Sequence, residues 1–322
     1  MIDPTKAVEW SRMGTRKVYG EILTELAPKY PELMVLVADV AASSGLEEFR
    51  KKYPKQFLNV GIAEQNMIGV AAGLAKNGQK VFVTSFAPFV SMRSYEWIRS
   101  YIAYMELDVT IVGIGSGVGL GSVGNTHYGR EDLALMQAIP GMSVFSPADG
   151  SETAKMVAFL LEYHKPSYLR LTGVEGIPVV YREEYSFQMG KAILQKEGKE
   201  VAILATGTMV YEALRTAKVL ERQGVSTAVY DVHTIKPIDR ELIHRLVEQN
   251  MLLVTMEEHS VEGGLGSIVA SCNVKEAHPV PQIMFGLPDC FTKAGSYRYV
   301  LEQSGLEARK MAERILEERK RL

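Results

Sequence analysis

Short apolar runs alternate with longer amphipathic segments along most of the chain. The runs that predict strands in the first half include residues 33–39, 57–61, 80–85 and 108–115. The segments that predict helices there include residues 14–26, 64–76, 90–104 and 150–163. Strands rich in Val and Ile that are flanked by helices are typical of a mostly parallel sheet covered on both faces. The pattern therefore predicts an α/β fold.

The alternation lapses between Gly173 and Gly190, where the composition predicts a linker. A second, shorter alternation of strands and helices follows it. The chain has 322 residues, enough for roughly two domains of ~100–200 residues each. We therefore expect two doubly wound α/β domains, a larger one over residues 1–178 and a smaller one over residues 179–322.

Composition limits the possible partners. The chain is 47% hydrophobic and 23% charged and has a net charge of −2, without the basic bias of a nucleic-acid-binding surface. It has no apolar signal segment near its start and no run approaching the ~18 apolar residues of a membrane span. The cysteines, Cys272 and Cys290, fit no metal-binding pattern and are expected to be buried thiols. We expect a cytoplasmic protein that binds neither nucleic acid nor membrane.

Glu64 is the first candidate functional residue. It begins the predicted helix 64–76 and shares a face with Ile68, Ala71 and Ala75. An acid in a first helical turn is ordinarily explained by the helix dipole. A carboxylate on the buried face, however, needs either a partner or a function.

Phe86 and Phe89 follow the predicted strand 80–85, at the end where ligands bind in open α/β sheets. Two phenylalanines at this edge could form an apolar slot for a flat ring. The aromatic residues further along, Trp97, Tyr101 and Tyr104, are expected to form the core face of the next helix.

A long loop from Gly113 to Gly129 contains seven glycines. It has G-x-G-x-x-G spacing, but a loop rather than a helix follows, so the dinucleotide fingerprint is weak. His127 near its end is a candidate for proton transfer or hydrogen bonding, and a solvated loop histidine is the alternative.

The run "MEEHSVEGGLGS" places Glu257, Glu258 and His259 side by side. No second cluster at ligand spacing supports a metal site. We expect a surface corner after a strand, followed by a helix entered through glycines.

Taken together, "GIAEQN", "SFAPFVS", "GNTHYGREDLALMQAIPGMSVFSPAD" and "MEEHSVEGGLGS" resemble the C-terminal half of a transketolase in order and spacing. The resemblance extends from about Gly14 to about Leu301. It implies a pyrimidine-binding domain for thiamine diphosphate followed by a transketolase C-terminal domain. The activity that it implies is transfer of a two-carbon ketol unit from a ketose donor to an aldose acceptor.

The resemblance also implies roles for individual residues. Glu64 falls on the glutamate that hydrogen-bonds the pyrimidine ring and so promotes loss of the proton from the reactive thiazolium carbon. Phe86 and Phe89 fall on the aromatic residues that enclose this ring. Asp39 matches an acid that lines the cofactor cleft, and His127 matches a histidine near the donor ketose.

The substrate-binding residues match only in part. Arg16 in "GTRK" and Ser43 in "AASS" resemble residues that hold a sugar phosphate. Gly115, Val123 and Gly173 stand where the family has a histidine, an aspartate and an arginine. We therefore expect a donor or acceptor other than the usual pentose phosphates.

The family holds Mg²⁺, and through it the diphosphate, with a GDG…N motif that this chain does not contain. The resemblance therefore implies a separate N-terminal subunit that carries the metal site. It also implies a homodimer of this chain at the centre of a heterotetramer. The alternatives are a subunit like 1-deoxyxylulose-5-phosphate synthase or the 2-oxo-acid dehydrogenase E1-beta subunit, and a non-catalytic structural subunit.

Overall fold

The first domain is built on a seven-stranded sheet. Its strands are β1 (Leu33–Val37), β2 (Phe57–Asn59), β3 (Lys80–Phe86), β4 (Val109–Ser116), β5 (Ser143–Phe145), β6 (Ser167–Thr172) and β10 (Thr234–Lys236). In the computed structural model, which describes residues 2–249 and 251–321, their order is β10-β5-β6-β4-β3-β1-β2. All neighbours are parallel except β10 and β5, which confirms the predicted mostly parallel sheet.

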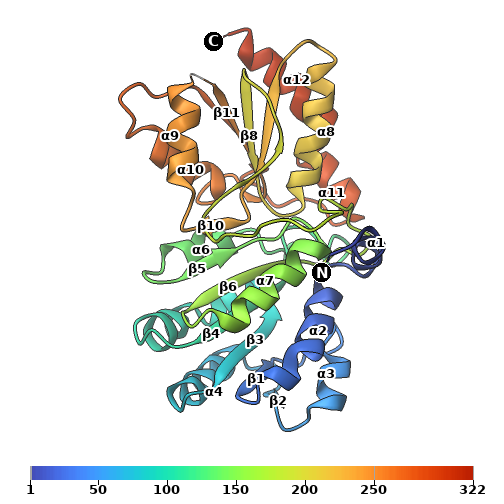
Figure 1. Ribbon diagram of the computed structural model, residues 1–322, viewed down its shortest axis with the longest axis vertical. Coiled ribbons are helices and arrows are strands. Elements are labelled where there is room, and N and C mark those ends of the chain that lie inside the picture. The colour runs from blue at the N-terminus through green and yellow to red at the C-terminus, as the bar shows by residue number, and fades with distance from the viewer. Residues whose placement is uncertain (1, 250, 322) are drawn as a thin grey trace.

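Helices cover both faces of this sheet (Figure 1). One face carries α1 (Pro4–Met13), α2 (Thr15–Leu26), the short helix η1 (Ala27–Lys29), α3 (Glu47–Lys52) and α7 (Gly150–Glu162). The other carries α4 (Glu64–Lys76), η2 (Phe89–Arg93), α5 (Tyr95–Trp97), η3 (Ile98–Ala103) and α6 (Asp132–Ala138). Successive side chains of a strand point to opposite faces, so Leu36 joins one core, whereas Val35 and Val37 join the other.

The segment predicted as one helix over residues 90–104 is instead a series of short helices, two of them with π-helical turns. The wider turn changes which side chains share a face. The expectation that Tyr101 and Tyr104 belong to the core is therefore wrong, since they are 41% and 86% exposed. Trp97 is partly buried against the core of the first domain.

The second domain has a five-stranded sheet. Its strands, in the order in which they pair, are β12 (Gln282–Leu287), β11 (Leu252–Ser260), β8 (Val201–Ala205), β9 (Thr227–Asp231) and β7 (Ile193–Lys196). Its helices are α8 (Met209–Glu221), α9 (Arg240–Glu248), α10 (Leu265–Asn273), α11 (Tyr297–Gln303) and α12 (Ala308–Arg319). Strand β7 is antiparallel to β9, and the other neighbours are parallel.

Strand β10 links the two domains. It follows β9 along the chain, yet it pairs with β5 of the first sheet, Thr234 opposite Phe145 and Lys236 opposite Val144. The ammonium of Lys236 also donates to the carbonyls of Gln137 and Ile139, at 2.8 and 2.6 Å. Figure 1 shows this strand at the junction, beneath the second sheet. The boundary between residues 178 and 179 stays a prediction.

Two further expectations from the sequence concern membrane-spanning helices and the two cysteines. Among the helices that the structure describes, none is long and apolar enough to cross a membrane. The cysteines are not the buried thiols that we expected, because Cys290 is exposed and Cys272 is partly exposed on α10. Cys290 lies in the connection after β12, where side chains face solvent.

Candidate active site

The candidate residues gather along one edge of the first sheet. Strands β1, β2 and β3 run parallel, so their carboxyl ends lie together. Asp39 follows β1, Glu64 follows β2, and Phe86 is the last residue of β3. This is the edge at which ligands bind in open α/β sheets.

Glu64 is the first residue of α4, and its side chain is 4% exposed. The Ser85 hydroxyl donates to Oε1 at 3.2 Å. Nη1 of Arg93 donates to both carboxylate oxygens, at 3.3 and 3.2 Å. The sequence therefore placed Glu64 correctly on the buried stripe of α4, but it did not reveal Arg93 as a partner.

Three rings meet beside this carboxylate. The ring centres of Phe86 and Phe89 are 6.0 Å apart, and that of His127 lies 5.9 Å from Phe86 and 5.1 Å from Phe89. Each pair meets edge to face, an arrangement that aromatic rings prefer over face-to-face stacking. The Arg93 guanidinium lies 4.0 Å from the centre of the Phe89 ring. The structure thus brings Glu64, both phenylalanines and His127 together.

The loop that carries His127 is held by the second domain. The side-chain amide of Asn125 donates to the carbonyl of Thr292 at 2.6 Å, and the backbone N–H of Gly295 donates to the carbonyl of Gly121 at 3.1 Å. Arg130 anchors the start of the same connection by donating to the carbonyls of residues 288 and 290. Sequence reasoning missed these contacts because the two segments are far apart in the chain.

Asp39 has a φ of 58°, a backbone conformation that residues other than glycine rarely adopt. Its carboxylate accepts from Nδ2 of Asn59 at 2.9 Å, and its backbone N–H donates to Oδ1 of Asn59 at 3.0 Å. Strained backbone of this kind is common at functional sites. Asn59 was not singled out from sequence, although a polar residue at the end of a strand in "FLNVG" was a usable signal.

Arg16 lies close to Ser43 and Gly173. Its guanidinium donates to the Ser43 carbonyl at 3.1 Å and to the Gly173 carbonyl at 2.7 Å. Burial lowers the pKa of this arginine from its ordinary value. The contact to Ser43 is made to its backbone carbonyl and not to its hydroxyl. Two N–H groups of Arg16 are therefore already hydrogen-bonded to backbone carbonyls of this chain.

Leu120 fills the space between two of the glycines that depart from the family pattern. A Cβ atom at Gly115 would lie 2.7 Å from Cδ1 of Leu120, and one at Gly173 would lie 2.9 Å from Cδ2. Either atom is too close for the leucine to stay in place. The same Cβ atom at Gly115 would lie 3.3 Å from Cδ1 of Phe86, so Leu120 lies beside the aromatic group.

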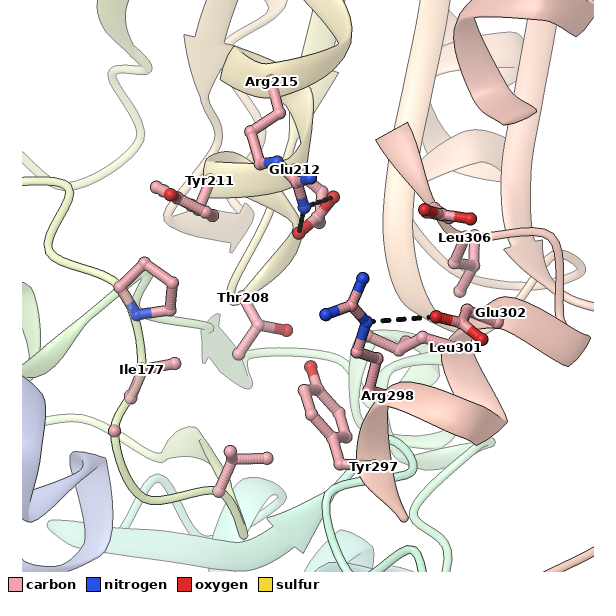
Figure 2. A pocket seen from close by; sticks show the side chains of 14 residues that line it. Ile177, Thr208, Tyr211, Glu212, Arg215, Tyr297, Arg298, Leu301, Glu302 and Leu306 are labelled. Carbon is pink, nitrogen blue, oxygen red and sulfur yellow. Dashed lines mark hydrogen bonds and ion pairs between the residues drawn. The ribbon is translucent and has the colours of Figure 1, made fainter. Parts of the chain in front are cut away.

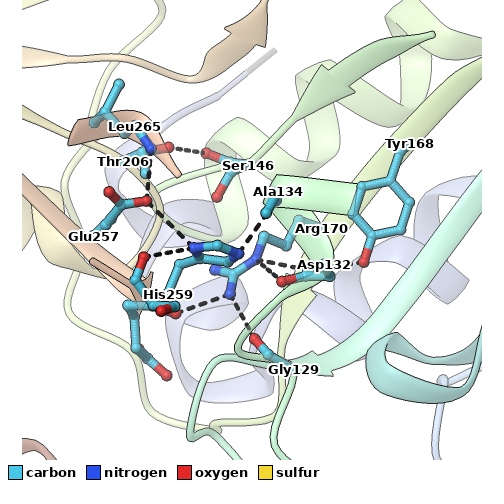
Figure 3. Close-up of polar contacts among 12 residues, drawn as sticks. Gly129, Asp132, Ala134, Ser146, Tyr168, Arg170, Thr206, Glu257, His259 and Leu265 are labelled. Atoms are coloured by element: carbon cyan, nitrogen blue, oxygen red, sulfur yellow. Dashed lines mark hydrogen bonds and ion pairs between the residues drawn. The ribbon is translucent and has the colours of Figure 1, made fainter. Parts of the chain in front are cut away.

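Arg170, which is close in sequence to Gly173, is not a free cation. Figure 3 shows its guanidinium enclosed by Asp132 and by backbone carbonyls. Nε donates to Oδ2 of Asp132 at 2.9 Å, and Nη2 donates to the carbonyls of Gly129 and Glu258 at 3.0 and 2.8 Å. Tyr168 adds a hydrogen bond of 2.8 Å to Asp132. This cluster is buried between the domains.

The expectation that Glu257, Glu258 and His259 form a surface corner is wrong. They are 1%, 2% and 0% exposed, because β11 continues into the junction and the first domain packs on its end. Glu257 accepts from the backbone N–H groups of Leu265 and Gly266, and burial raises its pKa to about 7. Burial lowers the pKa of His259 to about 4, and Nε2 of this neutral ring accepts from the N–H of residue 134 at 3.3 Å.

Glu258 also joins the two domains. Its carboxylate accepts from the backbone N–H of Val118 at 2.7 Å and from the hydroxyls of Thr208 and Tyr297, each at 2.6 Å. Burial raises the pKa of Glu258. This acid therefore has a structural function at the base of the loop that carries His127.

A separate cavity of about 400 Å³ lies between the linker and helices α8 and α11 (Figure 2). None of the candidate residues lines it. Its arginines are paired with acids on their own helices, Arg215 with Glu212 and Arg298 with Glu302, each at 3.0 Å. The cavity is therefore distinct from the candidate site.

Comparison with known proteins places both halves of the chain. Residues 11–173 match the transketolase pyrimidine-binding domain, and residues 190–311 match the transketolase C-terminal domain. A Methanocaldococcus jannaschii protein described as a transketolase C-terminal section is 40% identical over 310 residues, covering 96% of this chain and 97% of that protein. One subunit of an apulose-4-phosphate transketolase from Phocaeicola vulgatus is 36% identical, over 95% of this chain and 97% of that protein.

A 6-deoxy-6-sulfo-D-fructose transketolase subunit from a Clostridium species is 40% identical, over 92% of this chain and 91% of that protein. Among solved structures, a split gene transketolase, described as an inactive beta4 tetramer, aligns with a TM-score of 0.85 at 40% identity. That alignment covers 94% of this chain and 97% of the other. The chain therefore belongs to the transketolase family, as a C-terminal section in which a pyrimidine-binding domain precedes a transketolase C-terminal domain.

Proposed function

We propose that this chain is the C-terminal subunit of a split transketolase, which transfers a two-carbon ketol unit from a ketose donor to an aldose acceptor. The observation that carries the proposal is the meeting of Glu64, Phe86, Phe89 and His127 at the carboxyl edge of the first sheet. Their order in the chain and their positions in space both suit the pyrimidine-binding domain of this family.

The group around Glu64 fits the aminopyrimidine half of thiamine diphosphate. A buried carboxylate lies beside aromatic rings, and it already binds a planar cation that stacks on Phe89. When bound, thiamine diphosphate supplies the electron sink for breaking a carbon–carbon bond beside a carbonyl. Glu64 would hold a proton at a nitrogen of the ring, while Phe86 and Phe89 would enclose the ring and exclude water. Asp39 would line the cleft.

His127 is the residue that we assign to the substrate. Its Nδ1 lies 2.9 Å from the Thr126 hydroxyl, and its ring packs edge to face on Phe89. These contacts fix the plane of the ring. We assign Nε2 to hydrogen bonding or proton transfer at a hydroxyl of the donor ketose.

The remaining parts of the site would come from a second chain. This chain matches the C-terminal section of the family and has no GDG…N motif, so we assign Mg²⁺ and the diphosphate to an N-terminal subunit. Ile62 and Met92, on either side of Glu64 in the chain, are 75% and 48% exposed, as expected of a surface that a partner covers. We propose a central homodimer of this chain within a cytoplasmic heterotetramer.

The geometry around Leu120 supports a substrate other than the usual pentose phosphates. Leu120 fills the space beside Gly115 and Gly173, and Arg16 already binds two backbone carbonyls. Fewer polar groups would therefore be available to the end of the sugar that is remote from the reacting carbon. Steady-state kinetics of the assembled enzyme with xylulose 5-phosphate tests this point, and full activity with that donor would contradict it.

Glu64→Ala in the assembled enzyme tests the function itself. Loss of a positioned acid–base group typically costs ~10²–10⁴-fold in rate, and we expect kcat to fall in that range. Glu48→Ala is the matched control, because Glu48 is also a first-turn glutamate but is exposed on α3. Unchanged turnover in Glu64→Ala would favour the structural subunit. Activity with pyruvate but not with ketose donors would favour the synthase-like or dehydrogenase-like alternative.

A further inference from the structure

Arg93 occupies the part of the site that the proposed function gives to the cofactor. We propose that Arg93 is a positioning residue: its guanidinium stands in the place of the aminopyrimidine ring, holds Glu64 and Phe89 ready, and leaves when thiamine diphosphate binds. This inference rests on the proposed function of the same site. It concerns a residue that the sequence did not single out.

Two contacts define the position of Arg93. Nη1 donates to both oxygens of Glu64, at 3.3 and 3.2 Å, and Cζ lies 4.0 Å from the centre of the Phe89 ring. The guanidinium is thus hydrogen-bonded to the carboxylate and lies over the ring of the phenylalanine. A planar, nitrogen-rich ring held by the same two side chains would make the same pair of contacts.

The two occupants exclude each other. A separation of 4.0 Å between the guanidinium and the Phe89 ring is the thickness of one stacked layer, so no second planar group fits between them. Ser85 provides only one further hydrogen bond to Glu64, at 3.2 Å. A cofactor ring that contacts Glu64 and packs on the face of Phe89 that Arg93 covers must therefore displace Arg93.

The structure makes this displacement easy. The Arg93 side chain is 51% exposed, whereas that of Glu64 is 4% exposed, so the arginine can move into solvent while the glutamate stays in place. Arg93 is also the last residue of the π-helical turn η2. Such turns are frequent at functional sites.

Arg93 gives a buried carboxylate a partner before assembly. Without it, the hydroxyl of Ser85 would be the one side-chain donor to Glu64 among residues 2–249 and 251–321. A buried charge with too few partners is costly, and the side chain would turn toward water or the site would collapse. Arg93 therefore keeps Glu64 and Phe89 in the positions that the cofactor ring requires, but it competes with that ring for the same position.

Calorimetric titration of the assembled enzyme with thiamine diphosphate, in the presence of Mg²⁺, tests the inference. For Arg93→Ala we expect a Kd about tenfold lower than that of the unaltered enzyme, since the competitor is gone. Arg93→Lys keeps the charge but not the planar stack, so its Kd should lie between the two. Arg99→Ala removes an exposed arginine of η3 that touches neither Glu64 nor Phe89, and it should leave the Kd unchanged.

The other outcomes are distinct. Weaker binding in Arg93→Ala would mean that the arginine is a ligand of the cofactor, and it would overturn the inference. An unchanged Kd would overturn it as well, because no competition would then exist. If the unaltered enzyme does not bind thiamine diphosphate at all, the proposed function fails and the inference fails with it. The first two results leave the proposed function intact.

Discussion

Asp132 and Arg170 form an ion pair whose side chains are 0% and 5% exposed. Tyr168 and two backbone carbonyls complete their hydrogen bonds. Removing two ions from water is costly, and good geometry only offsets that cost. The pair therefore adds little net stability over apolar residues, but each ion depends strongly on the other.

Asp132→Ala should lower the free energy of unfolding by ~3–5 kcal/mol, because it leaves the Arg170 charge buried without its carboxylate. Chemical denaturation of the chain measures the change. Glu47→Ala breaks an exposed pair with Arg50 and should cost less than about 1 kcal/mol. Equal effects of the two substitutions would contradict the argument. Restoration by a second change, Arg170→Met, would support it.

Among single residues, the sequence predicted those that can be recognised from their immediate neighbours in the chain. Glu64 was found because an acid interrupts an apolar stripe, and Phe86 because it ends a strand. Arg93 was missed because its contact with Glu64 depends on the π-helical turn of η2, which simple helical spacing does not describe. Glu258 was misassigned because the first domain that covers it is remote in the chain.

The connection after β12 acts on the loop that carries His127. Asn125 donates to the carbonyl of Thr292 at 2.6 Å, and Gly295 donates to Gly121 at 3.1 Å. A loop tied at several points has fewer conformations to lose when a substrate binds. The second domain thereby contributes to the site without supplying a reacting group.

Asn125→Ala should loosen this loop. A net hydrogen bond is worth ~1 kcal/mol, so we expect the KM for the donor ketose to rise about fivefold in the assembled enzyme. Limited proteolysis of the chain should then cut within residues 117–129 faster than in the unaltered chain. Asn77→Ala, which removes an exposed side-chain hydrogen bond to Gly73 at the end of α4, is the control for both measurements. Equal cleavage rates would show that the contact does not restrain the loop.

The elements with strong periodicity were predicted well, as the bounds of α4 and the parallel strands show. The short antiparallel strands β7 and β10 were missed. Each forms a strand because it pairs with a neighbour, β7 with β9 and β10 with β5. Such elements are defined by tertiary contacts rather than by local preference.

Across the whole molecule, buried acids of the two domains lie close to one another. Asp231 at the end of β9 accepts from the Tyr181 hydroxyl at 2.7 Å, and Glu152 of α7 accepts from the N–H of Ala148 at 2.7 Å. Burial, and next the charge of Asp231, raise the pKa of Glu152 well above its ordinary value. Burial raises the pKa of Asp231 to about 7. The folded protein therefore holds protons there that the unfolded chain releases.

The unfolding temperature should therefore fall as the pH rises from about 6 to 7.5. A carboxyl group whose pKa is raised in the folded state stabilises the fold fully below its unfolded pKa of about 4, and that contribution is lost progressively as the pH rises from there to the folded pKa of about 7. The free energy of unfolding can fall by up to ~1.4 kcal/mol per pH unit for each proton that the folded protein holds and the unfolded chain has released. His233 and His259, whose pKa burial lowers to about 4, act in the opposite direction, but only below their unfolded pKa of about 6.5.

Scanning calorimetry of the chain at several pH values measures this dependence, and Asp231→Asn tests its origin. The amide carries no charge at any pH, so the decline between about pH 6 and 7.5 should become shallower, with the remainder due to Glu152 and Glu257. An unchanged slope in Asp231→Asn would assign the dependence to other groups.

Strand β10 makes the two domains less interchangeable than their separate family matches suggest. A fragment that ends at residue 178 would lack Thr234–Lys236 and would leave the edge of β5 uncovered. Uncovered edges recruit strands from other chains and promote aggregation. An exchange of C-terminal domains between relatives would therefore also replace a strand of the first domain, so modular engineering of this protein must carry residues 234–236 with the sheet that they complete.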